Sequence, residues 1–596
     1  MDTAEVTTKY PRLGALPDAD GTMFRVWSPL AQSLDVVIRG KSHRMSPTER
    51  GYLEIHVPKA GDGDLYRIRL NGDHEFPDPA SRYQPQGVHG PSEIVDPAGY
   101  SWRDDAWMGI PRDDLVFYEL HVGTFTPKGT FDGVRSRLDY LKGLGVTAIE
   151  LMPVADFPGR WNWGYDHASL YAPSRAYGRP DDLRKLVDEA HQIGLAVFLD
   201  VIYNHLGPDG AYAAAFAPMF TDKHHTPWGR AINLDDVHSD GVRAFFIDNA
   251  LTWLREYHID GLRLDAIHAI VDDSPTHFLA ELMAAVEAIP TGPTRMLIAE
   301  DSRNLNKVVL PRGEGGFGLT ATWTDDFHHQ IRNFTAGDVD GYFADFAGTT
   351  AADIARTIER GWFYEGQPSR SNGRPRGTET AVVRPSQVVI AIQNHDQIGN
   401  RPFGNRLNHD ISAAAYRAVS SLLLFAPELP LLFMGQEWAA STPFLFFTDH
   451  EEALGRQVSE GRKKEFAEFS GFSADVPDPQ DEQSFIRSRL DWAETERDPH
   501  ARILTLYHDL LSFRRRLPEG ASAEAIGTKS LRVRRGAFQL FVAFELLEDV
   551  ELPAGSVIIL NTEEERYAVD GHPPALSGST MTIHGPAAIL VQLETH

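Results

Sequence analysis

The chain has 596 residues, enough for several domains, and its 42% hydrophobic and 24% charged residues are typical of a globular protein. A formal net charge of −27 disfavours nucleic acid and anionic membrane surfaces as partners, because both bind proteins mainly through basic patches. The absence of cysteine excludes disulfides, thiolate metal sites and cysteine nucleophiles. We find no signal-peptide pattern and no membrane span, and a chain without cysteine suits a reducing compartment, so we expect a cytoplasmic protein.

Alternating strand patterns occur at both ends of the chain. Residues 23–27, 34–38 and 65–69 predict an N-terminal β-sandwich over residues 1–105. Four prolines between residues 77 and 91 then indicate an extended crossing into the next domain. A C-terminal β-sandwich over residues 519–596 is predicted from runs at 530–534, 538–543, 556–560, 581–583 and 588–592.

The middle of the chain alternates buried strand-like runs with amphipathic helices, such as those predicted over residues 181–193 and 241–257. The runs are residues 115–120, 148–152, 196–202, 261–265, 296–300, a weak one at 319–323, 388–393 and 431–434. Repeated βα units predict a parallel sheet, either doubly wound or closed. The number of runs, and the lack of a glycine-rich phosphate loop after the first, favour a (β/α)₈ TIM barrel over residues 106–518.

Carboxylates and histidines stand at or just after the ends of four predicted barrel strands. They are Asp200 and His205 on the third strand, Asp265 and His268 on the fourth, Glu300 on the fifth, and His395 and Asp396 on the seventh. The C-terminal ends of barrel strands meet at one mouth, so these side chains are predicted to converge there. Like charges held together raise one another's pKa, a cost that folds tolerate mainly where it serves chemistry. Paired carboxylates are what cleavage of a glycosidic bond requires.

These four segments resemble, in order, spacing and strand context, the four short sequence regions of the α-amylase superfamily, glycoside hydrolase family 13. The resemblance implies that Asp265 is the nucleophile, Glu300 the general acid/base and Asp396 a third carboxylate that grips sugar hydroxyls. It also implies that Arg263 holds Asp265 ionised. We expect burial and neighbouring anions to raise the pKa of Glu300. A nucleophilic carboxylate implies a glycosyl-enzyme intermediate and retention of the α configuration.

The same resemblance implies a binding site for the sugar that is attacked. His205 and His395 would hydrogen-bond this sugar, Tyr165 would lie under it as an aromatic platform, and Asp200 would be largely structural, close to Arg263. Trp228, in a polar loop that contains glycine, is a candidate for stacking on sugars.

Flanking segments at residues 152–159, 325–329 and 341–346 resemble most closely those of the maltooligosyltrehalose trehalohydrolases within this superfamily. The segment at residues 118–127 resembles both these enzymes and the branching enzymes. So does a β-sandwich placed before the barrel, a carbohydrate-binding-like domain in these enzymes. The resemblance implies hydrolysis of the α-1,4 bond next to the terminal trehalose of maltooligosyltrehalose. Free trehalose would be the product, no cofactor would be needed, and a maltooligosyltrehalose synthase would be functionally coupled as the source of substrate.

Contacts with the departing trehalose are expected from polar residues near the barrel mouth. We assign them to Trp323, Asp325, Asp326, His328, His329 and Glu437, although Glu437 could instead pair with a buried arginine. His268 is a further candidate for binding the substrate. Two adjacent histidines with Asp325 and Asp326 could also suggest a metal site. Neighbouring residues on a strand point to opposite faces, however, so we expect no metal there.

Three alternatives stay open. Asn204 matches a calcium ligand of many α-amylases, but the insertion after the third strand is too short for a large calcium-binding subdomain. A glucan branching or debranching enzyme of the same superfamily would share the barrel residues. A non-catalytic glycan-binding protein is the alternative of another class, and the intact set Asp265, Glu300 and Asp396 argues against it.

Overall fold

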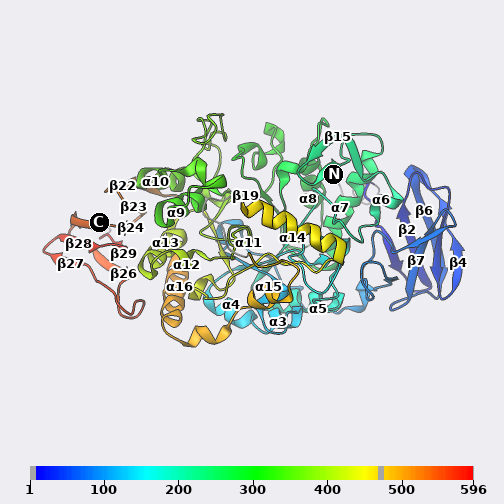
Figure 1. Ribbon diagram of the computed structural model, residues 1–596, viewed down its shortest axis with the longest axis horizontal. Coiled ribbons are helices and arrows are strands. Elements are labelled where there is room, and N and C mark those ends of the chain that lie inside the picture. Colours follow the sequence, from blue (N-terminus) through cyan, green and yellow to red (C-terminus); the bar gives the residue numbers. More distant parts are fainter. Residues whose placement is uncertain (1–8, 291, 468–475, 595–596) are drawn as a thin grey trace.

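A computed structural model describes residues 9–290, 292–467 and 476–594. Figure 1 shows three regions in a row: a sheet-rich region at one end, a helix-covered barrel in the middle, and a second sheet-rich region at the other end. The first described residues lie against the barrel, where the backbone N–H of Leu13 donates to Asp248 of a barrel helix at 3.0 Å. The active site is expected in the central region, because the predicted site residues stand at the ends of the barrel strands.

The N-terminal region consists of two antiparallel sheets that share one apolar core. One sheet has the order β1 (Gly14–Pro17), β2 (Gly21–Trp27), β6 (Tyr52–Pro58) and β5 (Ser46–Pro47), and the other β4 (Lys41–Arg44), β3 (Leu34–Ile38), β7 (Leu65–Leu70) and β8 (His74–Phe76), with β9 (Ser92–Glu93) on β7. Alternate side chains such as Phe24, Val36 and Ile68 are buried between the sheets. The predicted N-terminal sandwich is confirmed.

Eight parallel strands close into a barrel, as the sequence predicts. In barrel order they are β10 (Phe117–Leu120), β11 (Ala148–Leu151), β14 (Ala196–Val201), β17 (Gly261–Leu264), β18 (Met296–Glu300), β19 (Ala321–Trp323), β20 (Val388–Ala391) and β21 (Leu429–Phe433). The weak run at residues 319–323 contains the short strand β19. Closure follows because β21 pairs with β10. Small hairpins between strands are formed by β12 (Ala155–Asp156) with β13 (Ser169–Pro173) and by β15 (Phe220–Thr226) with β16 (Gly229–Ile232).

Helices surround the barrel (Figure 1). They are α2 (Val122–Phe125), α3 (Phe131–Arg135), α4 (Leu138–Leu144), α5 (Pro180–Gln192), α6 (Ala213–Phe216), α7 (Ser239–Glu256), α8 (Phe278–Glu287), α9 (Asp326–Ala336), α10 (Ala351–Arg360), α11 (His395–Gly399), α12 (Leu407–Asp410), α13 (Ala413–Phe425), α14 (Glu452–Ala467), α15 (Glu482–Arg487) and α16 (His500–Arg514). The two helices predicted over residues 181–193 and 241–257 are α5 and α7. In α5, Pro180 fits the first helical position and Leu183, Leu186 and Val187 form a buried stripe. Within the described residues, no helix combines the length and the apolar character needed to cross a membrane.

The C-terminal region again has two antiparallel sheets. Their orders are β22 (Ser522–Ala525), β23 (Ser530–Arg535), β24 (Phe538–Ala543), β29 (Ala587–Gln592) and β26 (Val557–Asn561), and β25 (Leu546–Glu551), β28 (Thr580–His584) and β27 (Ala575–Ser577). Phe541 and Ile589 of the first sheet and Met581 of the second are buried in one cluster. All five C-terminal runs that the sequence predicts are strands.

Side chains inside the barrel lie in layers, because alternate residues of each strand point inward. Phe117, Phe198 and Ile298 belong to an apolar layer that is fully buried. Two residues further along each strand, the inward positions become polar: Glu119 on β10, Glu150 on β11, Asp200 on β14, Arg263 on β17 and Glu300 on β18. The apolar layer thus supports a polar layer at the C-terminal ends of the strands.

A buried histidine joins the segment before the barrel to the barrel itself. His191 of α5 lies with Nδ1 2.9 Å from Asp104 Oδ2 and Nε2 2.8 Å from Asp260 Oδ2. Burial lowers the pKa of His191, but the hydrogen bonds with Asp104 and Asp260 outweigh it, so the pKa is raised. His191 therefore holds the two carboxylates as a cation.

We expect the stability of the fold to depend on this cation. Because the folded-state pKa of His191 is raised, its stabilisation is complete below the unfolded-state value of about 6.5 and is lost as the pH rises through the folded-state pKa. A His191→Asn variant should unfold about 4 °C or more below the parent at pH 6, and the gap should narrow toward pH 9. Thermal unfolding across this pH range measures the gap, and a gap that does not change with pH would show that His191 is neutral.

Candidate active site

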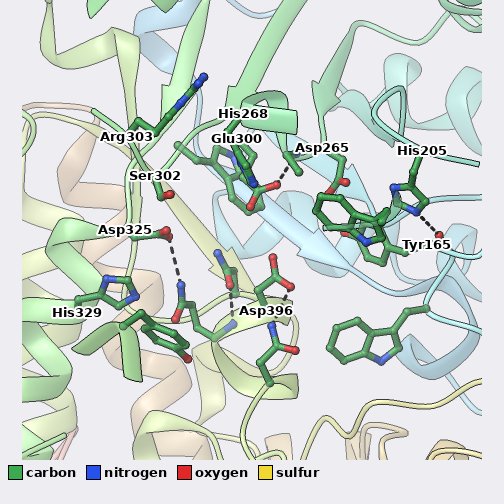
Figure 2. A pocket seen from close by; sticks show the side chains of 18 of the residues that line it. Tyr165, His205, Asp265, His268, Glu300, Ser302, Arg303, Asp325, His329 and Asp396 are labelled. Carbon is green, nitrogen blue, oxygen red and sulfur yellow. Dashed lines mark hydrogen bonds between the residues drawn. The ribbon is translucent and has the colours of Figure 1, made fainter. Parts of the chain in front are cut away.

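A large cavity of about 1130 Å³ opens at the C-terminal ends of the barrel strands. Its lining includes Tyr165, His205, Trp228, Asp265, His268, Glu300, Arg303, Trp323, Asp325, His329, Tyr342, Arg376, Asp396 and Gln397. In Figure 2, Asp265, Glu300 and Asp396 point into the same space, with Tyr165 and His205 on one side and Asp325 and His329 on the other. The three carboxylates that the sequence singles out are thus brought together.

Arg263 lies under Asp265 and Glu300 and is a cation that these two carboxyl groups share with Asp200. Its Nη1 donates to Asp200 Oδ2 at 2.7 Å and to Asp265 Oδ1 at 2.8 Å, and its Nη2 lies 2.9 Å from Glu300 Oε2. The guanidinium is fully buried and is covered by the ring of Trp323, whose centroid is 4.5 Å away. Arg263 therefore does not line the cavity but fixes the positions of the groups that do.

Asp265 is held by donors on both oxygens. Besides Arg263 on Oδ1, the amide of Asn204 donates to Asp265 Oδ2 at 2.8 Å and to its backbone carbonyl at 2.9 Å. Asn204, considered above as a calcium ligand, is used here to position Asp265. Two donors on one carboxylate stabilise its ionised form and fix its orientation, as a nucleophile requires.

Glu300 has donors on only one of its oxygens. Oε2 accepts from the backbone N–H of Ala266 at 2.7 Å and lies against Arg263. Ala266 has a φ of 40°, a left-handed conformation that is unfavourable for alanine and that turns its N–H toward Glu300. Burial raises the pKa of Glu300, Arg263 opposes this, and the charge of Asp265 raises it further, with a net increase. Since both neighbours of Oε2 are donors, a proton on Glu300 belongs on Oε1.

Asp396 and the aromatic residues complete this side of the cavity. Asp396 is 34% exposed at its side chain, and its Oδ1 accepts from Asn400 at 3.3 Å. Tyr165 donates its hydroxyl to Asp200 at 2.6 Å. His205 stacks on Trp228 with ring centroids 5.2 Å apart and planes 4° apart. An aspartate side chain and exposed aromatic faces can bind the hydroxyls and the apolar face of a sugar.

Three predicted contact residues lie away from the cavity. Asp326 and His328 are buried in the first turn of α9, where Asp326 Oδ2 accepts from the amide of Asn304 at 2.7 Å and His328 Nδ1 lies 2.7 Å from the carbonyl of Ile392. Glu437 is also buried, and its Oε1 accepts from the hydroxyls of Tyr118 and Tyr140, each at 2.9 Å. Its side-chain partners among the described residues are therefore tyrosines and not an arginine. These contact assignments are wrong because the turn after β21 and the first turn of α9 direct all three side chains into the protein.

The segment with the paired histidines is a helix rather than a strand. His328 and His329 lie in α9, so consecutive side chains are about 100° apart rather than on opposite faces, and our strand argument does not apply. His329 nevertheless lines the cavity while His328 does not, and within the described part of the chain neither ring nitrogen of His329 meets the geometry of a hydrogen bond. Burial lowers the pKa of His329 to about 3, so it is a neutral group available to a ligand.

Polar residues that the sequence analysis missed extend the cavity beyond Asp325. Gln397 Nε2 donates to Asp325 Oδ1 at 3.2 Å, and Arg376 Nη1 donates to Asp345 Oδ2 at 2.7 Å. Gln397 directly follows Asp396, so its position near the mouth could have been noticed. Arg376 comes from a long loop after α10 that carries no recognisable pattern. His395, in contrast to our expectation, does not line the cavity but lies under Tyr165 and Asp396.

One group of residues outside the cavity has the spacing of metal ligands. Among the residues that the structure describes, His224, Asp235 and Asp273 could bring ligand atoms within 4.8 Å of one another. The Lys223 ammonium, however, lies 2.8 Å from Asp235 and 3.6 Å from Asp273. These carboxylates are therefore already neutralised by a cation of the chain itself.

Comparison with known proteins agrees with this architecture. The family described as alpha amylase, catalytic domain, matches residues 89–225. The crystal structure of a putative alpha amylase from Salmonella typhimurium is similar, with a TM-score of 0.89 and 37% identity, over 97% of this chain and 99% of that one. The barrel is that of an α-amylase-type enzyme.

Relatives that match most of the chain show which family of α-amylase-type enzymes it belongs to. Malto-oligosyltrehalose trehalohydrolase from Deinococcus radiodurans is 49% identical over 515 residues, 85% of this chain and 83% of that protein. The enzyme of the same name from Arthrobacter ramosus is 41% identical over 586 residues, 96% of this chain and 99% of that protein. The chain belongs to the malto-oligosyltrehalose trehalohydrolase family.

Proposed function

We propose that this enzyme hydrolyses the α-1,4 bond next to the terminal trehalose of maltooligosyltrehalose and releases free trehalose. Asp265 acts as nucleophile, Glu300 as general acid/base and Asp396 as the third carboxylate. The observation that carries the proposal is the contrast between Asp265, with donors on both oxygens, and Glu300, with a raised pKa and one oxygen left for a proton. Two neighbouring carboxyl groups with different protonation are the arrangement that glycoside cleavage needs.

In the first step, an oxygen of Asp265 forms a bond to the anomeric carbon as the bond from that carbon to the trehalose oxygen breaks. Glu300 gives its proton to this departing oxygen, so trehalose leaves as a neutral alcohol. Asp396 accepts hydroxyl hydrogens of the attacked sugar, which rests on Tyr165. The result is a β-linked glycosyl-enzyme on Asp265.

In the second step, Glu300 is a carboxylate and takes a proton from water. The water oxygen attacks the anomeric carbon, the bond to Asp265 breaks, and the maltooligosaccharide leaves with its α configuration retained. Since Arg263 contacts both carboxylates, it can compensate as negative charge moves from Asp265 to Glu300. Because only protonated Glu300 starts the cycle, kcat/KM should fall as the pH rises through its raised pKa.

We place the departing trehalose on the side of the cavity that holds Asp325, His329 and Arg376. His268, exposed next to Trp228, also lines the cavity. Buried polar groups without partners, such as the nitrogens of His329, favour a ligand rich in hydroxyls. The substrate requires an enzyme that converts the reducing end of an α-1,4-glucan into a trehalose unit, and we propose functional coupling to such a maltooligosyltrehalose synthase.

Asp325 provides a test of the charge balance in the cavity. Burial and the nearby charges of Glu300 and Asp396 raise the pKa of Asp325 to about 7. Above that pH its negative charge makes Glu300 harder to ionise. An Asp325→Asn variant should therefore move the basic limb of the kcat/KM profile to lower pH, by roughly half a unit to one unit. A pH profile of trehalose release measures this shift, and a basic limb that stays in place would show that Asp325 does not influence Glu300.

The experiment for the function itself is product analysis after incubation with maltotriosyltrehalose, with maltopentaose and amylose as comparisons. We expect trehalose and maltotriose, with slow action on the two unmodified glucans. Branched products, or cleavage of maltopentaose without trehalose release, would instead assign a branching or general α-glucan-cleaving activity. No turnover of any substrate would favour a glycan-binding protein.

A further inference from the structure

Both carboxylate oxygens of Glu119 are used to hold one histidine. Glu119 is buried in the barrel on β10, two residues beyond the apolar layer. Its Oε1 lies 2.5 Å from Nδ1 of His395, and its Oε2 accepts from the backbone N–H of His395 at 3.0 Å. These two bonds fasten the seventh-strand loop to the first strand across the barrel.

The other ring nitrogen of His395 faces the active site. Its Nε2 lies 2.7 Å from the Tyr165 hydroxyl and 3.4 Å from Asp396 Oδ2. Tyr165 gives its only hydroxyl proton to Asp200 at 2.6 Å, so toward His395 it can only accept. Since a carboxylate receives Nδ1 and an accepting hydroxyl receives Nε2, both nitrogens of His395 must carry protons.

A neighbouring glutamate offers an internal comparison. Glu150 on β11 is the register partner of Glu119 and is equally buried, but neither of its oxygens has a hydrogen-bond partner among the described residues. Burial and the charges of Glu119 and Asp200 raise the pKa of Glu150 well above its usual value. The neutral form of Glu150 is therefore favoured, and Glu119 is the glutamate of this pair that holds His395.

Charged and titratable groups on several elements surround His395. Glu119 faces it from β10 and Asp396 from α11, while Arg263 on β17, His121 after β10, and the carboxyl groups of Glu150, Asp200 and Glu300 act on it through space. Burial lowers the pKa of His395, but Asp396 and Glu119 outweigh it and raise the pKa to about 10. His395 is thus a cation at neutral pH.

We propose that Glu119 is a positioning residue that keeps His395 doubly protonated and directs its Nε2–H to Tyr165 and Asp396. Through His395 it fixes the aromatic platform and the third carboxylate of the site. This inference rests on the function proposed above only through the roles of those two residues. It does not depend on whether trehalose or another sugar is the leaving group.

The decisive variant is Glu119→Gln, because an amide offers one acceptor and one donor where Glu119 offers two acceptors. Its oxygen can receive the backbone N–H, so its NH₂ must face Nδ1, which can accept only when it is unprotonated. His395 then becomes neutral. We expect kcat/KM to fall about 10- to 100-fold at pH 7.5 and less at pH 5.5, which moves the basic limb to lower pH.

Glu119→Asp separates charge from shape, since it keeps the charge and shortens the side chain. For Glu119→Asp we expect a lower kcat, but the basic limb of its kcat/KM profile should stay at the parental pH. Glu150→Gln is the matched control, because it replaces a neutral buried carboxyl group by an amide of the same size in the same layer. It should leave the pH profile unchanged. Thermal unfolding of all three variants shows whether each one folds.

Adding Glu119→Gln to a His395→Asn background tests whether Glu119 acts through His395. We expect no further displacement of the basic limb, whereas independent effects would add. The proposal is overturned if Glu119→Gln keeps the parental profile, if Glu119→Asp displaces the limb equally, or if the double variant shows additive shifts. The assay uses whichever α-glucan the parent cleaves. A parent that releases no trehalose therefore contradicts the proposed function, while the profiles of the variants still decide the role of Glu119.

Discussion

Replacement of Asp265 by alanine is expected to lower kcat by on the order of 10⁴-fold or more, because the covalent step has no other nucleophile. The variant should still fold. Arg263 keeps its ion pairs with Asp200 and Glu300, and the backbone N–H of Asp265 still donates to Val201 at 3.0 Å. Initial rates of trehalose release, with thermal unfolding as a control for folding, measure this effect.

Azide distinguishes the role of Asp265 from that of Glu300. In an Asp265→Ala variant the small anion can attack from the side of the lost carboxylate, so an activated α-glycosyl fluoride should yield the β-glycosyl azide. In a Glu300→Ala variant the intermediate on Asp265 would form first, and azide would then attack from the opposite side to give the α-azide. Products of the reverse configurations would exchange the two roles. An Asp265→Ala variant with parental turnover would contradict the mechanism.

The second large effect is expected at the contact between the barrel and the C-terminal sheets. Arg417 of α13 and Glu563 form a buried, bidentate ion pair, with Arg417 Nη2 2.6 and 2.7 Å from the two carboxylate oxygens. Arg417→Met leaves Glu563 buried without its partner. We expect a loss of about 3–5 kcal/mol in the free energy of unfolding, measured by denaturant titration.

Two further variants check this interpretation. Replacing both partners, as Arg417→Met with Glu563→Leu, should recover most of the lost stability because no unpaired charge remains. Arg566→Met is the matched control, since Arg566 and Asp509 bridge the same two regions at 3.1 Å but are largely exposed. Its cost should be below about 1 kcal/mol. Equal losses for the single and the double replacement would show that packing, and not charge, determines stability there.

The strands and the catalytic candidates could be predicted from the sequence because both depend on local patterns. A strand buried on both faces reads as a short apolar run, and even β19, with three residues, was indicated by its neighbours. Asp265, Glu300 and Asp396 stand at the ends of such runs, and barrel closure places strand ends together. Identifying these carboxylates required no knowledge of side-chain contacts.

The roles of residues that depend on tertiary contacts could not be predicted from the sequence. Glu437 and His328 have the polar character of ligand contacts, yet a turn and a helix direct them inward, while Asn204 is drawn to Asp265 by the loop after β14. The partners of Arg376 and Glu119 are separated from them by 31 and 276 residues.

The sequence by itself determined which strands form and which carboxylates meet, because strand patterns and strand ends are properties of short segments. Only the tertiary structure decided which of two equally buried glutamates, Glu119 or Glu150, holds His395. The physical reason is that a hydrogen bond needs its two atoms within about 3 Å and suitably aligned. Such distances between remote segments are set by the closed barrel as a whole.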